Sequence, residues 1–494
     1  MNKTFSVAFL VIMALGACVF RGDCAFAQGS EEKEPVRSHE EADDWLDGFE
    51  EESNEEAGTG PGEGDEFLGG FEEDTDEDSV QEGVEEEEPS TWSLDGEIAF
   101  KTTYNFSPDA LSPWCGFSMV RPGFELTLKK KFSDAWQAQA SVRGFYDLVY
   151  VLRGRDDYTD AVLDDYEKEL EVLDTFVQGS LTKKIDMKIG RQIVVWGPLF
   201  NLRVTDVLNP LDFRLPGLTD LDDLRLPVTM LKLDYFFGNW DLSGMWIPEI
   251  RFSMRPVFGS DFYPFPVPMP PAEEPENGFE FDDAEWAAAL VGTFSGWDLG
   301  FYWAYFYNDQ THMVLVSPGP PEQRVRKHAR IHMLGTAGNV AIGNWLLKGE
   351  LALFEGLEYT NTPGADHFRL DVGGGVEYTG FRETIISLEA VNRHIFDYDP
   401  LLELPGDELS ENEFQWAFRI VKDLLNDTLT LFLVVSTFGI KAEDGAFERL
   451  AAEYDITDAV SVTGGVVFYQ SGDKGRFRDV SQNDRLFLDV RYSF

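Results

Sequence analysis

Charged side chains of both signs recur along residues 190–225, a stretch rich in proline and leucine. Arginines and aspartates that face each other across a narrow passage create a transverse field, and such a field selects among permeants. The same residues could instead pair with one another and only hold the segment in place. The candidates, with one arginine further upstream, are Arg143, Arg191, Arg203, Asp206, Asp212, Arg214, Asp220, Asp222, Asp223 and Arg225.

Residues that would support catalysis or metal binding are scarce. The chain has six histidines, and none lies beside a recognisable nucleophile motif. The sequence contains no metal-ligand spacing, phosphate-binding loop or basic nucleic-acid patch. We therefore expect no enzyme activity, no metal, no cofactor and no nucleic-acid partner, with a membrane-embedded lipase or protease as a minor alternative.

The elements that must position the charges are short strands, which fill residues 92–494. Leu347, Leu351 and Leu353 alternate with Lys348 and Glu350, and similar alternation recurs at 124–129, 231–235, 368–378 and 429–436. Transmembrane strands alternate in this way between lipid and lumen. The charged residues on the polar face are of both signs and include Glu389. Cross-strand ion pairs are the simplest role for these charges.

The connections between strands alternate in length. Tight turns are expected near residues 132–136, 183–186, 238–240, 295–297, 343–345, 379–383, 426–428 and 455–458, and longer loops include 150–168, 193–226, 250–284, 307–327 and 393–412. This pattern predicts an all-β fold, a closed antiparallel transmembrane β-barrel of 18 strands, with 16 as the fallback. Tryptophans that follow tight turns should anchor the barrel at the periplasmic interface with the lipid: Trp136, Trp240, Trp297 and Trp345.

The last nine residues alternate cleanly and end on an aromatic residue. Leu486, Leu488, Val490, Tyr492 and Phe494 share one face of the expected final strand. An aromatic terminal residue with a second aromatic residue two positions earlier resembles the signal that the outer-membrane barrel assembly machinery recognises. Tyr492 and Phe494 are therefore the expected assembly signal, and both chain ends of the barrel should lie in the periplasm.

The N-terminal 27 residues have the composition of an export signal. Lys3 precedes an apolar stretch, and Ala25-Phe26-Ala27 is a cleavage motif. We expect a signal peptide over 1–27 and an outer-membrane protein of a Gram-negative bacterium. The alternative is lipidation at Cys18, which follows Leu15-Gly16-Ala17.

Residues 28–91 form an acidic arm. Residues 30–90 hold 27 aspartates and glutamates against two basic residues, a balance that predicts disorder. An aromatic-Leu-x-Gly-Phe-Glu-Glu pattern occurs twice in the arm, and its aromatic side chains are Trp45, Phe49, Phe67 and Phe71. Two such anchors could hold a periplasmic partner protein by avidity, although a solvated spacer is the simpler role.

The loop at 193–226 is the expected functional segment. It is too long and too rich in regularly placed leucines to be a mobile tip, so it should fold inward against the barrel wall as a constriction. Strand alternation breaks at Arg191, where a β-bulge would turn the side chain inward.

Three motifs in this region carry a resemblance to a known family. They are Arg191-Gln192 before Trp196-Gly197, Asp206-Val207-Leu208-Asn209-Pro210 with Asp212, and Leu226-Pro227-Val228 with Met230-Leu231. The sequence from about residue 93 to 494 resembles a family of porin-like outer-membrane proteins of unassigned function.

The resemblance implies an outer-membrane channel or ligand-selective transporter for a small-molecule permeant, in contact with membrane lipid. Its members are associated with transport of hydrophobic compounds. The alternative function is a scaffolding barrel that recruits a periplasmic protein through the acidic arm.

Overall fold

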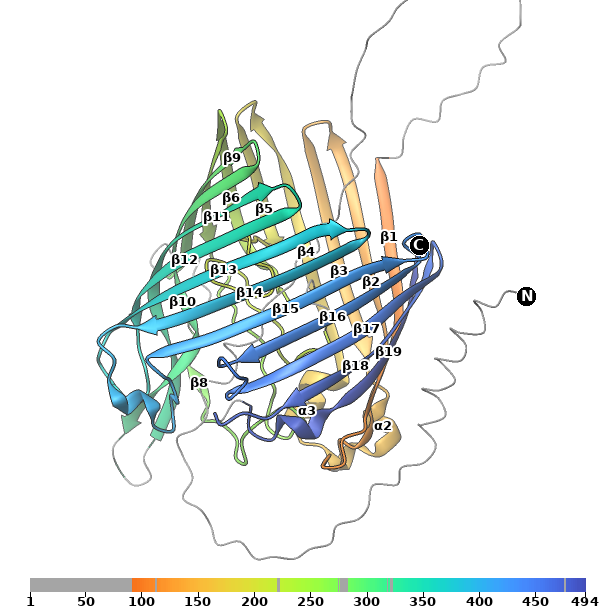
Figure 1. The fold of residues 1–494 in the computed structure, drawn as a ribbon, viewed down its shortest axis with the longest axis vertical. Helices are drawn as coiled ribbons and strands as arrows, with labels where there is room; N and C mark the ends of the chain where they lie inside the picture. Colours follow the sequence, from red (N-terminus) through yellow and green to blue (C-terminus); the bar gives the residue numbers. More distant parts are fainter. Residues whose placement is uncertain are drawn as a thin grey trace, which may run out of the picture.

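The computed structural model describes residues 91–111, 113–219, 223–273, 275, 283–317, 319, 323–474 and 477–494. Within these ranges, eighteen strands pair side by side in an antiparallel ring that closes between the last strand and the first (Figure 1). The prediction of an 18-stranded barrel is confirmed. The predicted signal peptide, the possible lipidation site Cys18 and the repeats of the acidic arm, with Trp45, Phe49, Phe67 and Phe71, lie outside the described residues.

The barrel strands follow one another around the wall in chain order. Their bounds are β1 Trp92–Asn105, β2 Gly116–Ser133, β3 Trp136–Tyr146, β4 Lys168–Thr182, β5 Ile185–Gln192, β6 Val228–Phe237, β7 Trp240–Ile247, β9 Glu285–Phe294, β10 Trp297–Ser317, β11 Gln323–Ile342, β12 Trp345–Leu357, β13 His367–Phe381, β14 Thr384–Ile395, β15 Asn412–Leu424, β16 Leu429–Phe438, β17 Gly445–Thr457, β18 Val460–Gln470 and β19 Arg485–Ser493. The two-residue strand β8, Ala272–Glu273, pairs in parallel with β11 while β7 pairs directly with β9.

The two ends of the barrel differ. All eight predicted tight turns lie at one end, together with Phe494, and we call this end the turn rim. The long connections lie at the other end, the loop rim, where Figure 1 shows the short helices α2 (Val149–Arg153) and α3 (Asp160–Val162). The predicted loop at 307–327 is wrong: β10 and β11 stay paired up to Ser317 and Gln323, because alternating apolar and basic residues there support a tall hairpin.

The two faces of the wall carry the predicted alternation. On β12 the side chains of Leu347, Leu351 and Leu353 are exposed on the outside, whereas Glu350 and Ala352 are buried on the inside. A membrane-spanning structure that is built from strands needs such an apolar outer face and a closed ring of hydrogen-bonded strands. The fold is therefore that of an outer-membrane barrel. Within the described residues, no helix combines the length and the apolar composition needed to cross a bilayer.

The turn rim carries a series of aromatic side chains on the outer face. Trp297 and Trp345 are exposed and share their faces with the exposed Phe301 and Leu347. Trp240 packs edge-on against Phe294 of β9. These positions fit the predicted interfacial anchors.

The chain terminus closes the barrel. The backbones of Gly96 and Phe494 exchange two hydrogen bonds of 2.9 Å, and β19 pairs with both β18 and β1. The rings of Tyr492 and Phe494 stack on the outer face with centroids 5.9 Å apart. The terminal aromatic pair is thus exposed on the outer face of the closed barrel.

Deleting Phe494 should reduce the amount of folded protein in the outer membrane by more than half. The deletion removes the terminal aromatic side chain and both backbone hydrogen bonds between Phe494 and Gly96. The measurement is the heat-modifiable, folded fraction in isolated outer membranes. Phe381→Ala, at another exposed aromatic residue of the turn rim, is the control, and an equal loss in both variants would contradict a specific assembly role.

Candidate functional site: a plug across the lumen

Residues 193–227, between β5 and β6, leave the wall and fold inside the barrel (Figure 1). We call this segment the plug. Many of its apolar side chains are buried, among them Leu202 and Leu211, each 1% exposed. The buried ones belong to two separate clusters, one against the wall from β6 to β15 and the other against β16 to β18. The plug therefore packs against two different parts of the wall.

Two glutamates of the wall hold one end of the plug. Glu350 of β12 accepts hydrogen bonds from the backbone N–H of Leu199 at 2.8 Å and of Thr205 at 2.9 Å, and from the Thr205 hydroxyl at 2.7 Å. Glu389 of β14 accepts from the N–H groups of Phe200 at 2.8 Å and Asn201 at 2.7 Å. A carboxylate that accepts several N–H groups makes strong, charge-assisted bonds. We call Glu350 and Glu389 the plug seat.

Glycines create the space that the plug seat requires. Gly197 has a φ of +80°, and a Cβ there would overlap the Glu350 carboxyl group. On β13, a Cβ at Gly373 would overlap the side chains of Leu199 and Val204. The run Gly373-Gly374-Gly375 thus leaves a hollow in the wall that receives Leu199.

The other end of the plug packs against the last strands. The Tyr469 hydroxyl of β18 donates to the Pro216 carbonyl at 2.5 Å, and Phe213 lies in a buried cluster with Phe447. At the loop rim, the Tyr166 hydroxyl donates to the Arg214 carbonyl at 3.3 Å. Loops of the loop rim therefore cover this end of the plug.

Several of the predicted charges pair inside the plug itself. Asp206 is 5% exposed, and its Oδ2 lies 2.9 Å from Arg225 Nη2 and 3.6 Å from Arg203 Nε. Its Oδ1 accepts from the Trp196 N–H at 3.1 Å. These three charged residues join the beginning, middle and end of the plug, so they stabilise its internal fold.

One other predicted residue, Arg214, connects the plug to the wall. Arg214 Nη2 lies 2.6 Å from both Asp212 Oδ2 of the plug and Glu169 Oε2 of β4. Burial alone would raise the pKa of Asp212, but the charge and hydrogen bonds of Arg214 outweigh it and lower that pKa. Asp212 therefore stays ionised at neutral pH and holds the guanidinium group that reaches the wall.

Arg191 does not have the predicted conformation. The pairings of β5 with β4 and β6 run through Arg191 without a register shift, so the predicted bulge is wrong. The break in strand alternation coincides instead with Gly190, whose backbone φ is +128°. Arg191 binds Glu171 at 3.0 Å and Glu249 at 2.7 Å, and no aspartate of the plug pairs with it in the described contacts.

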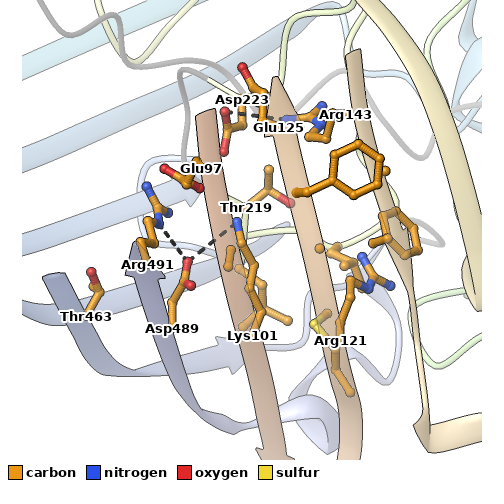
Figure 2. A pocket seen from close by; sticks show the side chains of 18 of the residues that line it. Glu97, Lys101, Arg121, Glu125, Arg143, Thr219, Asp223, Thr463, Asp489 and Arg491 are labelled. Carbon is orange, nitrogen blue, oxygen red and sulfur yellow. Dashed lines mark hydrogen bonds and ion pairs between the residues drawn. The ribbon is translucent and has the colours of Figure 1, made fainter. Parts of the chain in front are cut away.

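A cavity of about 730 Å³ remains between the plug and the wall of β1, β2, β3, β17, β18 and β19. Figure 2 shows charges of both signs pointing into it. Asp489 binds Lys101 at 3.5 Å and Arg491 at 2.9 Å, and Arg143 of β3 reaches Asp223 of the plug at 3.5 Å. The cavity extends from Phe494 at the turn rim to Tyr166 beneath the covering loops.

The structure thus brings most of the predicted residues together at the plug. Asp220 and Asp222 lie outside the described residues. Glu350 and Glu389 were expected on the lumen face as partners of cross-strand ion pairs, and Glu389 does lie 3.8 Å from Lys348 of β12. Their role as plug seat escapes the sequence because their donors are backbone N–H groups. The glycine run at 373–375 was the available signal. In the part of the chain that the structure describes, no group of three or more acidic, histidine or cysteine side chains is arranged to hold a metal.

Comparison with known proteins identifies the family of the barrel. A family model described as "Protein of unknown function (DUF1302)" matches residues 117–494. The chain belongs to the DUF1302 family. The match covers the barrel from β2 onwards, including the plug and its seat, and this agrees with the resemblance carried by the plug motifs.

Solved structures provide a more distant likeness to this DUF1302 protein. Acinetobacter baumannii OccAB2 is 10% identical, with a TM-score of 0.48 over 82% of this chain and 98% of that chain. Pseudomonas aeruginosa OccK1 (OpdK) is 11% identical, with a TM-score of 0.46 over 82% and 98%. Vibrio cholerae OmpT without loop L8 is 11% identical, with a TM-score of 0.39 over 82% and 99%. None of the curated proteins compared with the chain matches it.

Proposed function

We propose that this protein is an outer-membrane channel for small molecules, with the plug as its constriction and the turn rim facing the periplasm. The observation that carries the proposal is the plug itself, which bridges the seat on β12 and β14 to the buried cluster at β16 to β18. An 18-stranded barrel without internal elements would leave a wide aqueous lumen. A constriction fixed to both sides turns that lumen into a selective passage.

The cavity beside the plug provides the route for the permeant. Its walls carry carboxylates and guanidinium groups on facing elements, as with Arg143 and Asp223. Facing charges of opposite sign impose a transverse field on anything that passes. Apolar side chains such as Leu215, Leu218 and Phe487 line the same cavity, which suits the hydrophobic cargo that the family resemblance implies.

Planar-bilayer recording tests the proposal. The refolded barrel should give small, stepwise, ohmic currents, because the plug leaves a narrow passage. A folded barrel that gives no current, even after the plug is removed, would overturn the channel function and favour a scaffolding barrel.

Arg143→Ala should make the channel more selective for cations, and Asp223→Asn should make it more selective for anions. Each substitution removes one charge from the facing pair, and a shift of roughly twofold in the permeability ratio is expected from the loss of one pore-lining charge. The measurement is the reversal potential in a salt gradient. Arg382→Ala, at a side chain that is exposed beside Glu383 in the turn between β13 and β14, should leave the ratio unchanged. Equal ratios in all variants would remove this pair from the constriction.

A further inference from the structure

In the part of the chain that the structure describes, the strand pairing of the wall stops short on the loop-rim side between β4 and β10. The strands between them are short, and the last partner pairs are Thr175 with Arg191 and Trp286 with Tyr305. Among the described residues, 168–174 of β4 therefore form strand pairs only with β3, and 306–317 of β10 form no strand pairs with β9. Four strands of the wall therefore extend less far toward the loop rim than β4 and β10 do: β5, β6, β7 and β9.

Side chains satisfy the strand edges that this gap exposes. Arg191 Nη1 donates to the Val172 carbonyl at 2.6 Å. Glu249 accepts from the Thr229 N–H at 2.7 Å, and Glu285 accepts from the Tyr307 N–H at 2.8 Å. Backbone polar groups at membrane depth must have partners. Around the gap these partners are side chains, whereas elsewhere in the wall they are the backbone groups of a neighbouring strand.

Residues 249–255, which follow β7, cross the gap, and we call them the door segment. Arg251 binds Glu171 of β4 at 2.9 Å, while the Ser253 N–H and Arg255 bind Asp309 of β10 at 2.7 and 3.1 Å. On the inner side, the Met254 backbone exchanges two hydrogen bonds of 2.8 Å with Leu211 and Phe213 of the plug. The door segment is also held by Glu249, which binds Arg191 at 2.7 Å, and by Phe252, whose ring stacks on His328 of β11. The closure of the wall thus depends on side-chain contacts and a short bridge to the plug.

A second cavity, of about 140 Å³, lies directly behind the door segment. It is enclosed by Arg251, Phe252 and Ser253 on one side and by plug residues 203–213 on the other. Its apolar lining comes from both the plug and the wall: Val204, Leu208, Phe306, Ile331, Phe354 and Leu357. The volume is below that of a complete small-molecule site, so it would hold only part of a ligand while the door segment is closed.

We propose that the door segment is a lateral opening through which a hydrophobic, membrane-partitioning solute passes between the lumen and the outer leaflet. The lateral opening rests on the proposed channel function. It gives the substrate of the channel a route that avoids the water beyond the loop rim. Opening separates Arg251 and Arg255 from the two strand edges and breaks the bridge to the plug, and it requires no separation of paired strands. Movement of the door segment would also displace Leu211 and Phe213, so the lateral opening and the constriction act together.

Photolabelling from the lipid phase tests the proposal. The full chain is reconstituted in dioleoylphosphatidylcholine vesicles that contain palmitate with a diazirine at its chain end. After irradiation, mass spectrometry locates the label. The variant Arg251→Ala/Arg255→Ala should increase label on Phe306, Ile331 and Phe354 at least about threefold over wild type, the population change expected from loss of partly exposed ion pairs. Arg382→Ala/Lys441→Ala, at exposed cations away from the gap, should not.

The outcomes separate the two proposals. Label confined to outward-facing residues such as Phe301 in both variants would overturn the lateral opening, whatever the conductance. Currents that are absent while the cavity is labelled would instead overturn the channel function. If the double variant does not refold, Arg255→Ala alone keeps the contact between Arg251 and Glu171 and should still increase the label.

Discussion

Replacing residues 194–226 with a short Gly-Ser loop should raise the single-channel conductance by about an order of magnitude, because an unplugged barrel of this size has a water-filled lumen. β5 and β6 are neighbours in the wall, so a tight connection can join them without distorting the ring. The variant should keep its heat-modifiable mobility, since every pair of barrel strands remains. Planar-bilayer recording gives the conductance.

The matched control shortens a different connection. Removing residues 315–324 trims the tip of the β10–β11 hairpin, where Leu315 and Val316 are exposed, and should leave the conductance unchanged. If the plug deletion folds and conducts like the wild type, the plug is not the constriction, and the restriction to flow would have to come from the covering loops.

Glu350→Ala/Glu389→Ala should release the plug from its seat while the barrel remains folded. The substitutions leave four backbone N–H groups without acceptors, and each unsatisfied buried donor costs about 1–3 kcal/mol. We expect currents that switch between a low and a high level, with a mean several times that of the wild type. Glu350→Gln/Glu389→Gln keeps one acceptor oxygen at each site and should give an intermediate behaviour.

A third carboxylate on the lumen face controls for the loss of charge. Glu377 of β13 binds Lys348 at 3.3 Å rather than the plug, so Glu377→Ala should change selectivity without inducing switching. Switching in Glu377→Ala as well would show that net lumen charge, and not the seat, holds the plug.

The barrel was predictable because its signals are local. A period of two along each strand and turn residues at fixed intervals determine the number of strands and the face of each side chain. Glu350 shows this well: its inward direction follows from Leu347 and Leu351 beside it. The inward fold of residues 193–226 was also predictable, from leucines that a solvated loop would not retain.

The contacts of the plug were less predictable, because their partners are distant in sequence and often belong to the backbone. Glu389 binds N–H groups that every sequence provides, so no residue type marks its target. The predicted bulge at Arg191 is wrong because Gly190 absorbs the break in alternation through its own positive φ. The sequence predicts Arg and Asp residues of both signs in the plug, but their pairing within the segment depends on a backbone path that sequence patterns do not give.

The link between Tyr469 and Pro216 has a consequence for the order of biogenesis. The two residues are 253 positions apart, and Phe200 and Glu389 are 189 apart. The plug is therefore synthesised long before the strands that hold it, and contacts of such high sequence separation form late in folding. The nascent plug must stay soluble without its seat until β12, β14 and β18 arrive, after which the closing of β19 on β1 encloses it. Its proline-rich, charged composition suits that waiting period as much as it suits the finished barrel.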